Sequence, residues 1–210
     1  LWIYQRKSNN IHDLKPHIWD EWADETGSIG KAYGYQVGQI SHYADGDYDQ
    51  MDRVLKDLRE NPYSRRIMTN LYTFADLSEM HLYPCAFNVI YNVTHDAGVE
   101  RPTLNMLLVQ RSQDVLAANN WNVCQYALLL MMVAQVSDMV PGEFVHMIAD
   151  AHIYDRHIDI VRELLERPCY PAPKVSLNPD VHDFYAFTTD DLVVEDYVFG
   201  PQVTGIPIAV

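Results

Sequence analysis

Apolar and polar residues follow two spacings along this chain, one typical of helices and one typical of strands. The clearest helical spacing covers residues 48–60, and Asn61-Pro62 ends it. Four apolar residues fall there at positions i, i+3, i+4 and i+7, which places them on one helical face: Met51, Val54, Leu55 and Leu58. Residues 48–60 are therefore predicted to form an amphipathic helix.

Alternating positions predict a hairpin in the middle of the chain. Residues 85–93 alternate, and one face of this run carries Phe87, Val89, Tyr91 and Val93. A turn at 95–98 separates the run from a second apolar run at 103–110. We expect the two runs to pair as strands of one hairpin.

Weaker patterns predict the other elements. Residues 122–139 are apolar nearly all round, so we expect a buried helix there. Further helices are expected at 76–80 and 154–166, and further strands at 67–72, 143–149, 175–177 and 192–199. Helices and strands mix without regular alternation. This order predicts an α+β fold, with a single domain over residues 1–210 and a mixed or antiparallel twisted sheet flanked by helices.

The charge balance narrows the function classes. The formal net charge is −14 over 210 residues, so the chain lacks the excess of Lys and Arg that coats nucleic acid. A few arginines placed together can still hold one phosphate in an acidic protein. Arginines that occur close together are therefore candidates for an anion site.

Cysteines and apolar runs bear on the location of the protein. The three cysteines, Cys85, Cys124 and Cys169, are widely spaced and form no CxxC pair. This spacing favours reduced thiols over a disulfide framework or a zinc site. The longest apolar run, residues 127–134, is shorter than a membrane span, and no signal peptide is visible. These features predict a cytoplasmic protein without a membrane partner.

Cys85 is the first candidate for chemistry. It follows Tyr83-Pro84 at the start of a predicted strand, where a side chain can be accessible. A thiolate is a nucleophile, and a nearby cation or hydrogen-bond donor favours it over the thiol. The alternative is a small core residue, which is the commoner role of a free cysteine.

Arginine-containing segments lie on both sides of Cys85. Arg65-Arg66 occurs between a predicted helix and a predicted strand, and forked guanidinium groups suit phosphate. Arg111-Ser112 ends the returning strand and offers a charge and a hydroxyl, and Asp114 offers an acceptor for a ring N–H. The alternative for Arg65-Arg66 is a pair of solvated surface ion pairs. The alternative for residues 111–114 is a turn that simply ends the strand.

Asn122, His152 and Tyr154 add neutral hydrogen-bonding groups. The Asn122 amide carries a donor and an acceptor side by side, as a pyrimidine ring does, although Asn122 could also cap a helix. His152 and Tyr154 are two residues apart, so both face one side of an extended segment and suit one hydroxyl group. A metal is the rival interpretation, but His152 and His157 are spaced unfavourably for a helix, and no metalloenzyme signature is present.

These segments occur together in the order and spacing of one family. The chain resembles thymidylate synthase over essentially its whole length, and it looks similar to the branch found in some bacilli and their phages. The blocks that carry the resemblance are 18–23, 64–67, 83–85, 110–114, Asn122, 126–127, 150–154 and 207–210. The resemblance implies a homodimeric α+β enzyme whose subunits pack sheet against sheet. It also implies that about 50 family residues precede Leu1.

The reaction implied by the resemblance converts dUMP to dTMP. The co-substrate 5,10-methylenetetrahydrofolate supplies the one-carbon unit and the hydride and leaves as dihydrofolate. Cys85 is implied to add to C6 of the uracil ring, with Arg111 close to the thiol. The implied catalytic residues are Cys85, Arg111, Asn122 and Tyr33. No metal and no nucleic acid is required.

The resemblance assigns other residues to the two substrates. The nucleotide-binding set is Arg65, Arg66, Gln110, Arg111, Ser112, Asp114, Asn122, His152 and Tyr154. Arg65 and Arg66 are implied to reach the phosphate bound by the partner subunit. The folate-binding set is Trp19, Trp22, Asp114, Ala118, Trp121 and Ala209. Residues 207–210 are implied to close over the bound pair and exclude water.

Departures from the family keep two other functions open. Ala118 and Ala149 stand where the family usually has glycine, so a methyl at Ala118 is expected to crowd the ligands. Ala86 stands where many members have histidine. A dUMP or other pyrimidine nucleotide hydroxymethylase of the same fold would use water in place of hydride, although the retained Asn122 favours uracil. The third function is that of a non-catalytic nucleotide-binding homologue.

Overall fold

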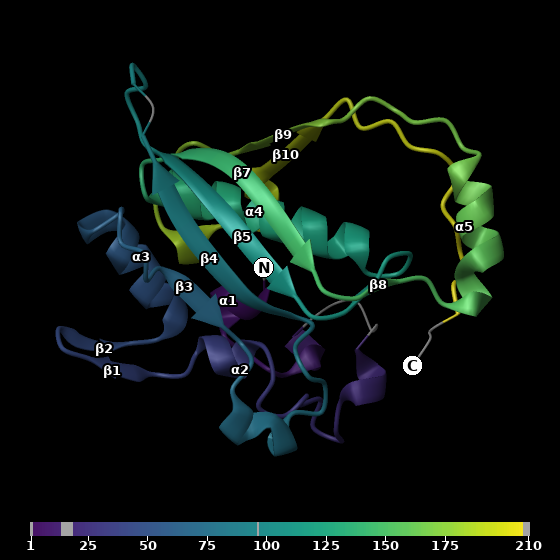
Figure 1. Ribbon diagram of the computed structural model, residues 1–210, viewed down its shortest axis with the longest axis horizontal. Helices are drawn as coiled ribbons and strands as arrows, with labels where there is room; N and C mark the ends of the chain where they lie inside the picture. The colour runs from purple at the N-terminus through teal and green to yellow at the C-terminus, as the bar shows by residue number, and fades with distance from the viewer. Residues whose placement is uncertain (1, 14–18, 96, 208–210) are drawn as a thin grey trace.

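A mixed sheet forms the centre of the molecule (Figure 1). The computed structural model describes residues 2–13, 19–95 and 97–207. The sheet has four strands in the order β3-β4-β5-β7. Their bounds are Met68–Asn70, Ala86–Thr94, Thr103–Gln110 and Val140–Ile148. The β3, β4 and β5 strands pair antiparallel, whereas β5 and β7 pair parallel, so the predicted hairpin and mixed sheet are both confirmed.

Two long helices cover one face of this sheet. Helix α3 spans Gln50–Glu60 and contacts β3, and helix α4 spans Asn119–Val136 and contacts β5 and β7. In Figure 1, α4 runs behind β5 and β7. The four apolar residues that predicted α3 are all buried in the core between helices and sheet. Helix α4 also provides the crossover that a parallel pairing of β5 with β7 requires.

The opposite face of the sheet is apolar and open. Met68 on β3 and Val145 and Met147 on β7 are exposed by 43%, 49% and 55%. Side chains alternate along a strand, so the buried Leu108 on β5 and the exposed Val145 belong to opposite faces. One face of the sheet therefore builds the core, and the other presents apolar side chains at the surface.

Short elements surround the sheet. They are α1 (Trp2–Arg6), α2 (Gly34–Val37), β1 (Ser41–Tyr43), β2 (Gly46–Tyr48), β6 (Gln113–Asp114), β8 (Ala151–His152), α5 (Ile158–Leu165), β9 (Lys174–Leu177) and β10 (Leu192–Glu195). Three further pairs of strands form, namely β1 with β2, β6 with β8, and β9 with β10. Helix α5 lies apart from the sheet in Figure 1 and contains no buried residue. No helix among the described residues is long and apolar enough to cross a membrane.

Two sequence-based predictions about side-chain burial are wrong. Phe87 was expected on the same face of β4 as Val89. The register of β4 shifts between Ala86 and Asn88, so Phe87 does not share the core-facing side with the buried Val89. Helix α4 is not buried all round, because its first turns expose Trp121 by 73% and also expose Cys124. The other predicted elements are found with bounds that differ by a few residues, as at most element ends.

Candidate active site around Cys85

Cys85 lies immediately before β4, where the hairpin brings the end of β5 beside it. Ala86 on β4 faces Gln110, the last residue of β5, so the residue that follows β5 meets Cys85. The backbone N–H of Arg111 donates to the Cys85 carbonyl at 2.9 Å. The Cys85 side chain is partly buried. The alternation that predicts the hairpin thus also sets the pairing of Cys85 with Arg111.

The Arg111 side chain folds back over the Cys85 turn. Its Nε donates to the Pro84 carbonyl at 3.0 Å, and its Nη2 donates to the Tyr83 carbonyl at 2.9 Å. The same Nη2 lies 3.7 Å from the Cys85 Sγ. Burial raises the pKa of the Cys85 thiol, and the positive charge of Arg111 opposes this by favouring the thiolate. Within the described chain, Arg111 forms no ion pair with a carboxylate.

Tyr33 supports the same turn from the other side. Its hydroxyl accepts the backbone N–H of Cys85 at 3.3 Å. Burial raises the pKa of Tyr33 well above its usual value, and a charge on Cys85 raises it further, so the phenol stays protonated. Gly34 makes this position possible, because a Cβ there would lie 1.9 Å from the Ser8 carbonyl oxygen. Tyr33 therefore presents a neutral hydroxyl beside the nucleophile candidate.

Buried glutamines connect the end of β5 to the first turn of α4. Gln110 and Gln113 are each exposed by only 1%. Gln110 donates to Gln113, and the Oε1 of Gln113 also accepts from the Asn122 Nδ2 at 3.1 Å. Asn122 is not the helix cap, because Ala118 occupies that position. Gln110 is too buried to contact a nucleotide directly. It can affect nucleotide binding only through its hydrogen bond to Gln113, which in turn binds Asn122.

A short parallel pairing joins the 150–154 segment to the site. Asp114 on β6 faces His152 on β8. The rings of His152 and Tyr154 meet edge to face with centroids 5.0 Å apart. The His152 Nδ1 lies 3.3 Å from an Asp150 carboxylate oxygen. Sequence spacing placed these two rings on one side, and the structure brings them next to Asp114.

Asp114 and His157 connect this segment to the C-terminal region. The Asp114 carboxylate accepts the backbone N–H groups of Leu116 and Ala117, each at 3.0 Å. The fully buried His157 lies 3.8 Å from the same carboxylate oxygen, and its Nε2 lies 2.8 Å from the Pro207 carbonyl. Sequence reasoning assigned His157 no role beyond a rejected metal site. The one available signal is that His157 follows the 150–154 block by three residues.

Two tryptophans, Trp19 and Trp22, lie beside Tyr33. The Trp19 ring lies 5.7 Å from the Trp22 ring and 6.3 Å from the Tyr33 ring, centroid to centroid. Trp121 is exposed at the start of α4. Ala118 has φ −122°, and neither Ala118 nor Ala149 has the positive φ that would favour glycine, so the alanines cause no backbone strain. The predicted folate residue Ala209 lies outside the described residues.

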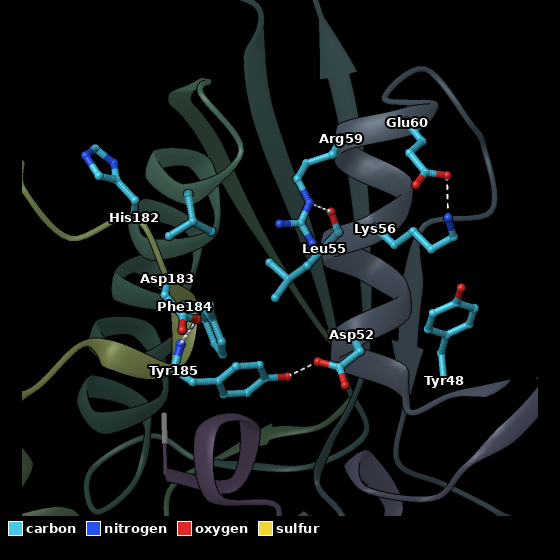
Figure 2. A pocket seen from close by; sticks show the side chains of 11 residues that line it. Tyr48, Asp52, Leu55, Lys56, Arg59, Glu60, His182, Asp183, Phe184 and Tyr185 are labelled. Carbon is cyan, nitrogen blue, oxygen red and sulfur yellow. Dashed lines mark hydrogen bonds and ion pairs between the residues drawn. The ribbon is translucent and has the colours of Figure 1, made fainter. Parts of the chain in front are cut away.

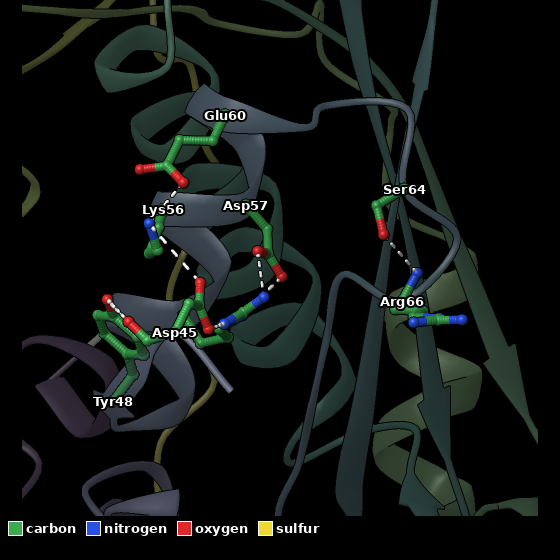
Figure 3. A network of polar contacts seen from close by, with 8 residues as sticks. Asp45, Tyr48, Lys56, Asp57, Glu60, Ser64 and Arg66 are labelled. Atoms are coloured by element: carbon green, nitrogen blue, oxygen red, sulfur yellow. Dashed lines mark hydrogen bonds and ion pairs between the residues drawn. The ribbon is translucent and has the colours of Figure 1, made fainter. Parts of the chain in front are cut away.

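Arg65 and Arg66 lie far from Cys85 in the same chain. Both are exposed in the turn before β3. Met68 faces Ile90 in the register of β3 with β4, so Arg66 lies toward the far end of β4. At about 3.3 Å per residue, this end of β4 is about 20 Å from Cys85. In Figure 3, Arg66 lies near Ser64, apart from the ion pairs on α3.

A groove between α3 and residues 182–185 is separate from this site. Figure 2 shows Tyr185 reaching across it to donate a hydrogen bond to Asp52. None of the residues predicted for the active site lines this groove. Among the described residues, no group of three or more His, Cys, Asp or Glu is placed to hold a metal ion.

The fold and the site define a class: an α+β protein with a cysteine and an arginine paired at the end of a hairpin and neutral hydrogen-bonding groups around them. The family model for thymidylate synthase matches residues 1–210. The chain belongs to the thymidylate synthase family.

Named relatives support this assignment. The chain is 41% identical to the thymidylate synthase of Bacillus subtilis subsp. natto over 207 residues, which cover 97% of this chain and 72% of the relative. It is 40% identical to the thymidylate synthase of Bacillus phage phi3T, with the same coverage of both chains. The structure of thermostable thymidylate synthase A from Bacillus subtilis matches with a TM-score of 0.91 at 39% identity, covering 99% of this chain and 74% of that chain. The predicted family, fold class and similarity to the bacillus and phage branch are confirmed.

Proposed function

We propose that this protein converts dUMP to dTMP through a covalent bond between Cys85 and the uracil ring. Membership of the family supports the reaction. The observation that carries the proposal is the position of the Arg111 Nη2, 3.7 Å from the Cys85 Sγ. A cation at this distance favours the thiolate, which is the attacking form of cysteine.

The Cys85 thiolate adds to C6 of uracil, and the electrons of the C5–C6 double bond move toward C5 and O4. C5 then forms a bond to the transferred carbon and loses its proton. With the folate bound, the bond between the transferred carbon and the folate nitrogen breaks and a hydride from the folate reduces that carbon to a methyl group. Departure of the thiolate then restores the C5–C6 double bond and frees Cys85. When bound, 5,10-methylenetetrahydrofolate supplies the one-carbon unit and a hydride. The neutral hydroxyl of Tyr33, hydrogen-bonded to the Cys85 backbone, lies where it can hold a water or proton near the ring.

The other residues of the site bind and orient the nucleotide. Arg111 and Ser112 hold the phosphate, and Asn122 reads the uracil amide edge. His152 and Tyr154, whose rings lie 5.0 Å apart, hold the ribose hydroxyl. Gln110 acts from its buried position through Gln113 and Asn122. These assignments follow the family resemblance and fit the proximity of the side chains.

The tryptophans beside Tyr33 and at the start of α4 suit a flat folate ring. Trp19 and Trp22 lie on the Tyr33 side, and Trp121 lies at the start of α4. Asp114 ends β6, and Ala118 directly precedes α4. We assign these residues and Ala209 to folate binding. The His157 contact with the Pro207 carbonyl holds the start of the 207–210 segment, for which the resemblance implies closure over the ligands.

A homodimer completes the phosphate site in this proposal. Arg65 and Arg66 are exposed and remote from Cys85 of their own chain. This position leaves both side chains available to a phosphate bound by a partner subunit. The open sheet face with Met68, Val145 and Met147 supports an interface of sheet against sheet. Residues 1–210 belong to one catalytic domain that acts in pairs, and the cytoplasmic location stays a prediction.

One assay tests the proposed function. The protein is given dUMP and 5,10-methylenetetrahydrofolate, and nucleotide products and dihydrofolate are measured together. We expect dTMP and dihydrofolate in equal amounts. Hydroxymethyl-dUMP without dihydrofolate would instead identify a hydroxymethylase. Binding of dUMP without any turnover would identify a non-catalytic nucleotide-binding protein.

A further inference from the structure

Gln113 is a buried residue to which the proposed function assigns no contact with the nucleotide. It lies between Gln110 and Asn122 and is exposed by 1%. We propose that Gln113 is a positioning residue that fixes the orientation of the Asn122 amide, and that it thereby makes the site select a uracil over a cytosine nucleotide. This inference rests on the proposed function, in which Asn122 reads the pyrimidine.

Two backbone carbonyls determine which way the glutamine amides point. The Gln110 Nε2 donates to the Ser112 carbonyl at 2.8 Å, and the Gln113 Nε2 donates to the Asp114 carbonyl at 3.0 Å. A carbonyl can only accept, so each contact requires the NH₂ side of the amide. Turning either amide by 180° would place two oxygens against each other in a buried position, which is costly.

With these orientations set, the Oε1 of Gln113 must act as an acceptor. It accepts from the Gln110 Nε2 and from the Asn122 Nδ2, the latter at 3.1 Å. Asn122 must therefore keep its NH₂ group toward Gln113. Its carbonyl oxygen and its second N–H then remain in one fixed order for a ligand.

His146 anchors the far end of the same chain of hydrogen bonds. Its Nε2 lies 3.0 Å from the Gln110 Oε1. Burial lowers the pKa of His146, so the ring is neutral at neutral pH, and its Nε2 can carry the proton that the Gln110 oxygen accepts. Every described amide group between His146 and Asn122 thus has a defined donor and acceptor side.

A fixed amide discriminates between the two pyrimidines, whereas a freely turning amide does not. Uracil presents an N3–H donor beside the O4 acceptor, and cytosine presents an N3 acceptor beside the N4 donor. These two edges are mirror orders of donor and acceptor. A free asparagine can serve either edge by a 180° turn, but a fixed one leaves the wrong edge with two unpaired contacts. The discrimination therefore depends on what holds Asn122, which is Gln113.

Calorimetric titration of the protein with dUMP and dCMP tests this inference. We expect the native protein to prefer dUMP. In Gln113→Met the chain length is kept but the acceptor is lost, so the preference for dUMP should fall by about 10-fold or more, mainly through tighter dCMP binding. In Gln113→Glu a buried carboxyl stays protonated and keeps both a donor and an acceptor, so most of the preference should remain.

Gln135→Met is the matched control. Gln135 also lies on α4 and donates to the carbonyls of Asn178 and Val181, at 2.8 and 2.9 Å, but it is not connected to Asn122. This variant should lower Tm and leave the preference unchanged. If Gln113→Met does not fold, Gln113→Ala makes the same comparison.

The outcomes separate this inference from the proposed function. A folded Gln113→Met or Gln113→Ala with unchanged preference would overturn the role of Gln113 alone. A native protein that binds neither nucleotide, or that prefers dCMP, would overturn the proposed function and this inference with it. Loss of preference in the Gln113→Met variant, with retention in Gln113→Glu and Gln135→Met, supports the inference.

Discussion

Arg53 on α3 and Arg111 beside Cys85 show two uses of the same side chain. Arg53 is held by carboxylates: its Nε and Nη2 contact Asp57 at 2.9 and 2.8 Å, and its Nη1 contacts Asp45 at 2.7 Å. These partners raise the pKa of Arg53. Arg111 instead contacts backbone carbonyls and the Cys85 thiol. The charge of Arg53 is neutralised within the fold, whereas that of Arg111 remains available for an anion.

The surroundings of the two arginines differ in the same way. Figure 3 shows the α3 region as a network of ion pairs, in which Lys56 also contacts Glu60 and Asp45. Near Cys85, the Asp114 carboxylate accepts backbone N–H groups, and Asp150 lies against His152. No described carboxylate reaches Arg111. In this acidic chain the carboxylates around α3 thus neutralise Arg53, whereas Arg111 keeps its charge for an anion.

The largest expected effect is that of removing the nucleophile. Cys85→Ser should lower kcat by about 10⁴-fold or more, because an alcohol does not ionise to a nucleophile in this environment. dUMP binding, measured by calorimetry, should stay within about threefold, since Arg111 and Asn122 remain. Cys124→Ser is the matched control, because Cys124 is exposed on α4 and should be dispensable. Turnover by Cys85→Ser near the native rate would contradict the mechanism.

Replacing each arginine by methionine tests the difference between Arg53 and Arg111. Arg111→Met should lower kcat/KM by about 10²–10³-fold, because it removes charged hydrogen bonds to phosphate and the cation beside the thiol. Its thermal stability should change little. Arg53→Met should do the reverse, lowering the free energy of unfolding by about 1 kcal/mol while leaving kcat/KM close to native. Equal effects on activity from both variants would show that the distinction between the two regions is wrong.

The remote pair Arg65 and Arg66 extends the comparison across subunits. The double variant Arg65→Ala/Arg66→Ala should lose about 10²-fold in kcat/KM as the partner's phosphate site weakens. Mixing it with Cys85→Ser protein should restore activity to about a quarter of native, because half of the randomly formed dimers contain one intact site. No recovery on mixing, with both variants shown to form mixed dimers, would contradict a shared site.

The smallest expected effect is on the pH profile of the thiol. Burial raises the pKa of Cys85, so alkylation of Cys85 in the nucleotide-free protein should still increase with pH above about 8.5, the usual thiol value. Arg111 favours the thiolate, so Arg111→Met should move the profile to higher pH. Arg53→Met should not move it. Peptide mass spectrometry separates Cys85 from the exposed thiols of Cys124 and Cys169.

Much of the fold could be predicted because its signals are local. The helical spacing of residues 48–60 gave α3, and alternation gave the hairpin of β4 and β5. The parallel pairing of β5 with β7 could not be predicted. It depends on how the chain returns to the sheet after α4, and no local pattern encodes this return. The position of Phe87 was missed because a bulge changes the alternation without changing the residue types.

In the candidate site, too, local sequence blocks could be predicted and contacts between distant elements could not. Cys85, Arg111, His152 and Tyr154 could be predicted as a group because their blocks resemble a family. The structure places Arg111 beside Cys85 and His152 beside Tyr154. The link from Gln113 to Asn122 could not be predicted, because it depends on the orientation of buried amides from different elements. Arg65 and Arg66 remain a prediction, since their proposed site lies on a second subunit.

Trapping the covalent intermediate tests whether Cys85 attacks the uracil ring. With 5-fluoro-dUMP and 5,10-methylenetetrahydrofolate, the reaction should stop after carbon transfer, because fluorine at C5 cannot leave as a proton does. Mass spectrometry should then find the nucleotide and the folate attached to the peptide that contains Cys85, and the Cys85→Ser protein should remain unmodified. Attachment at another residue, or turnover of dUMP by a protein that never forms the Cys85 adduct, would contradict the account.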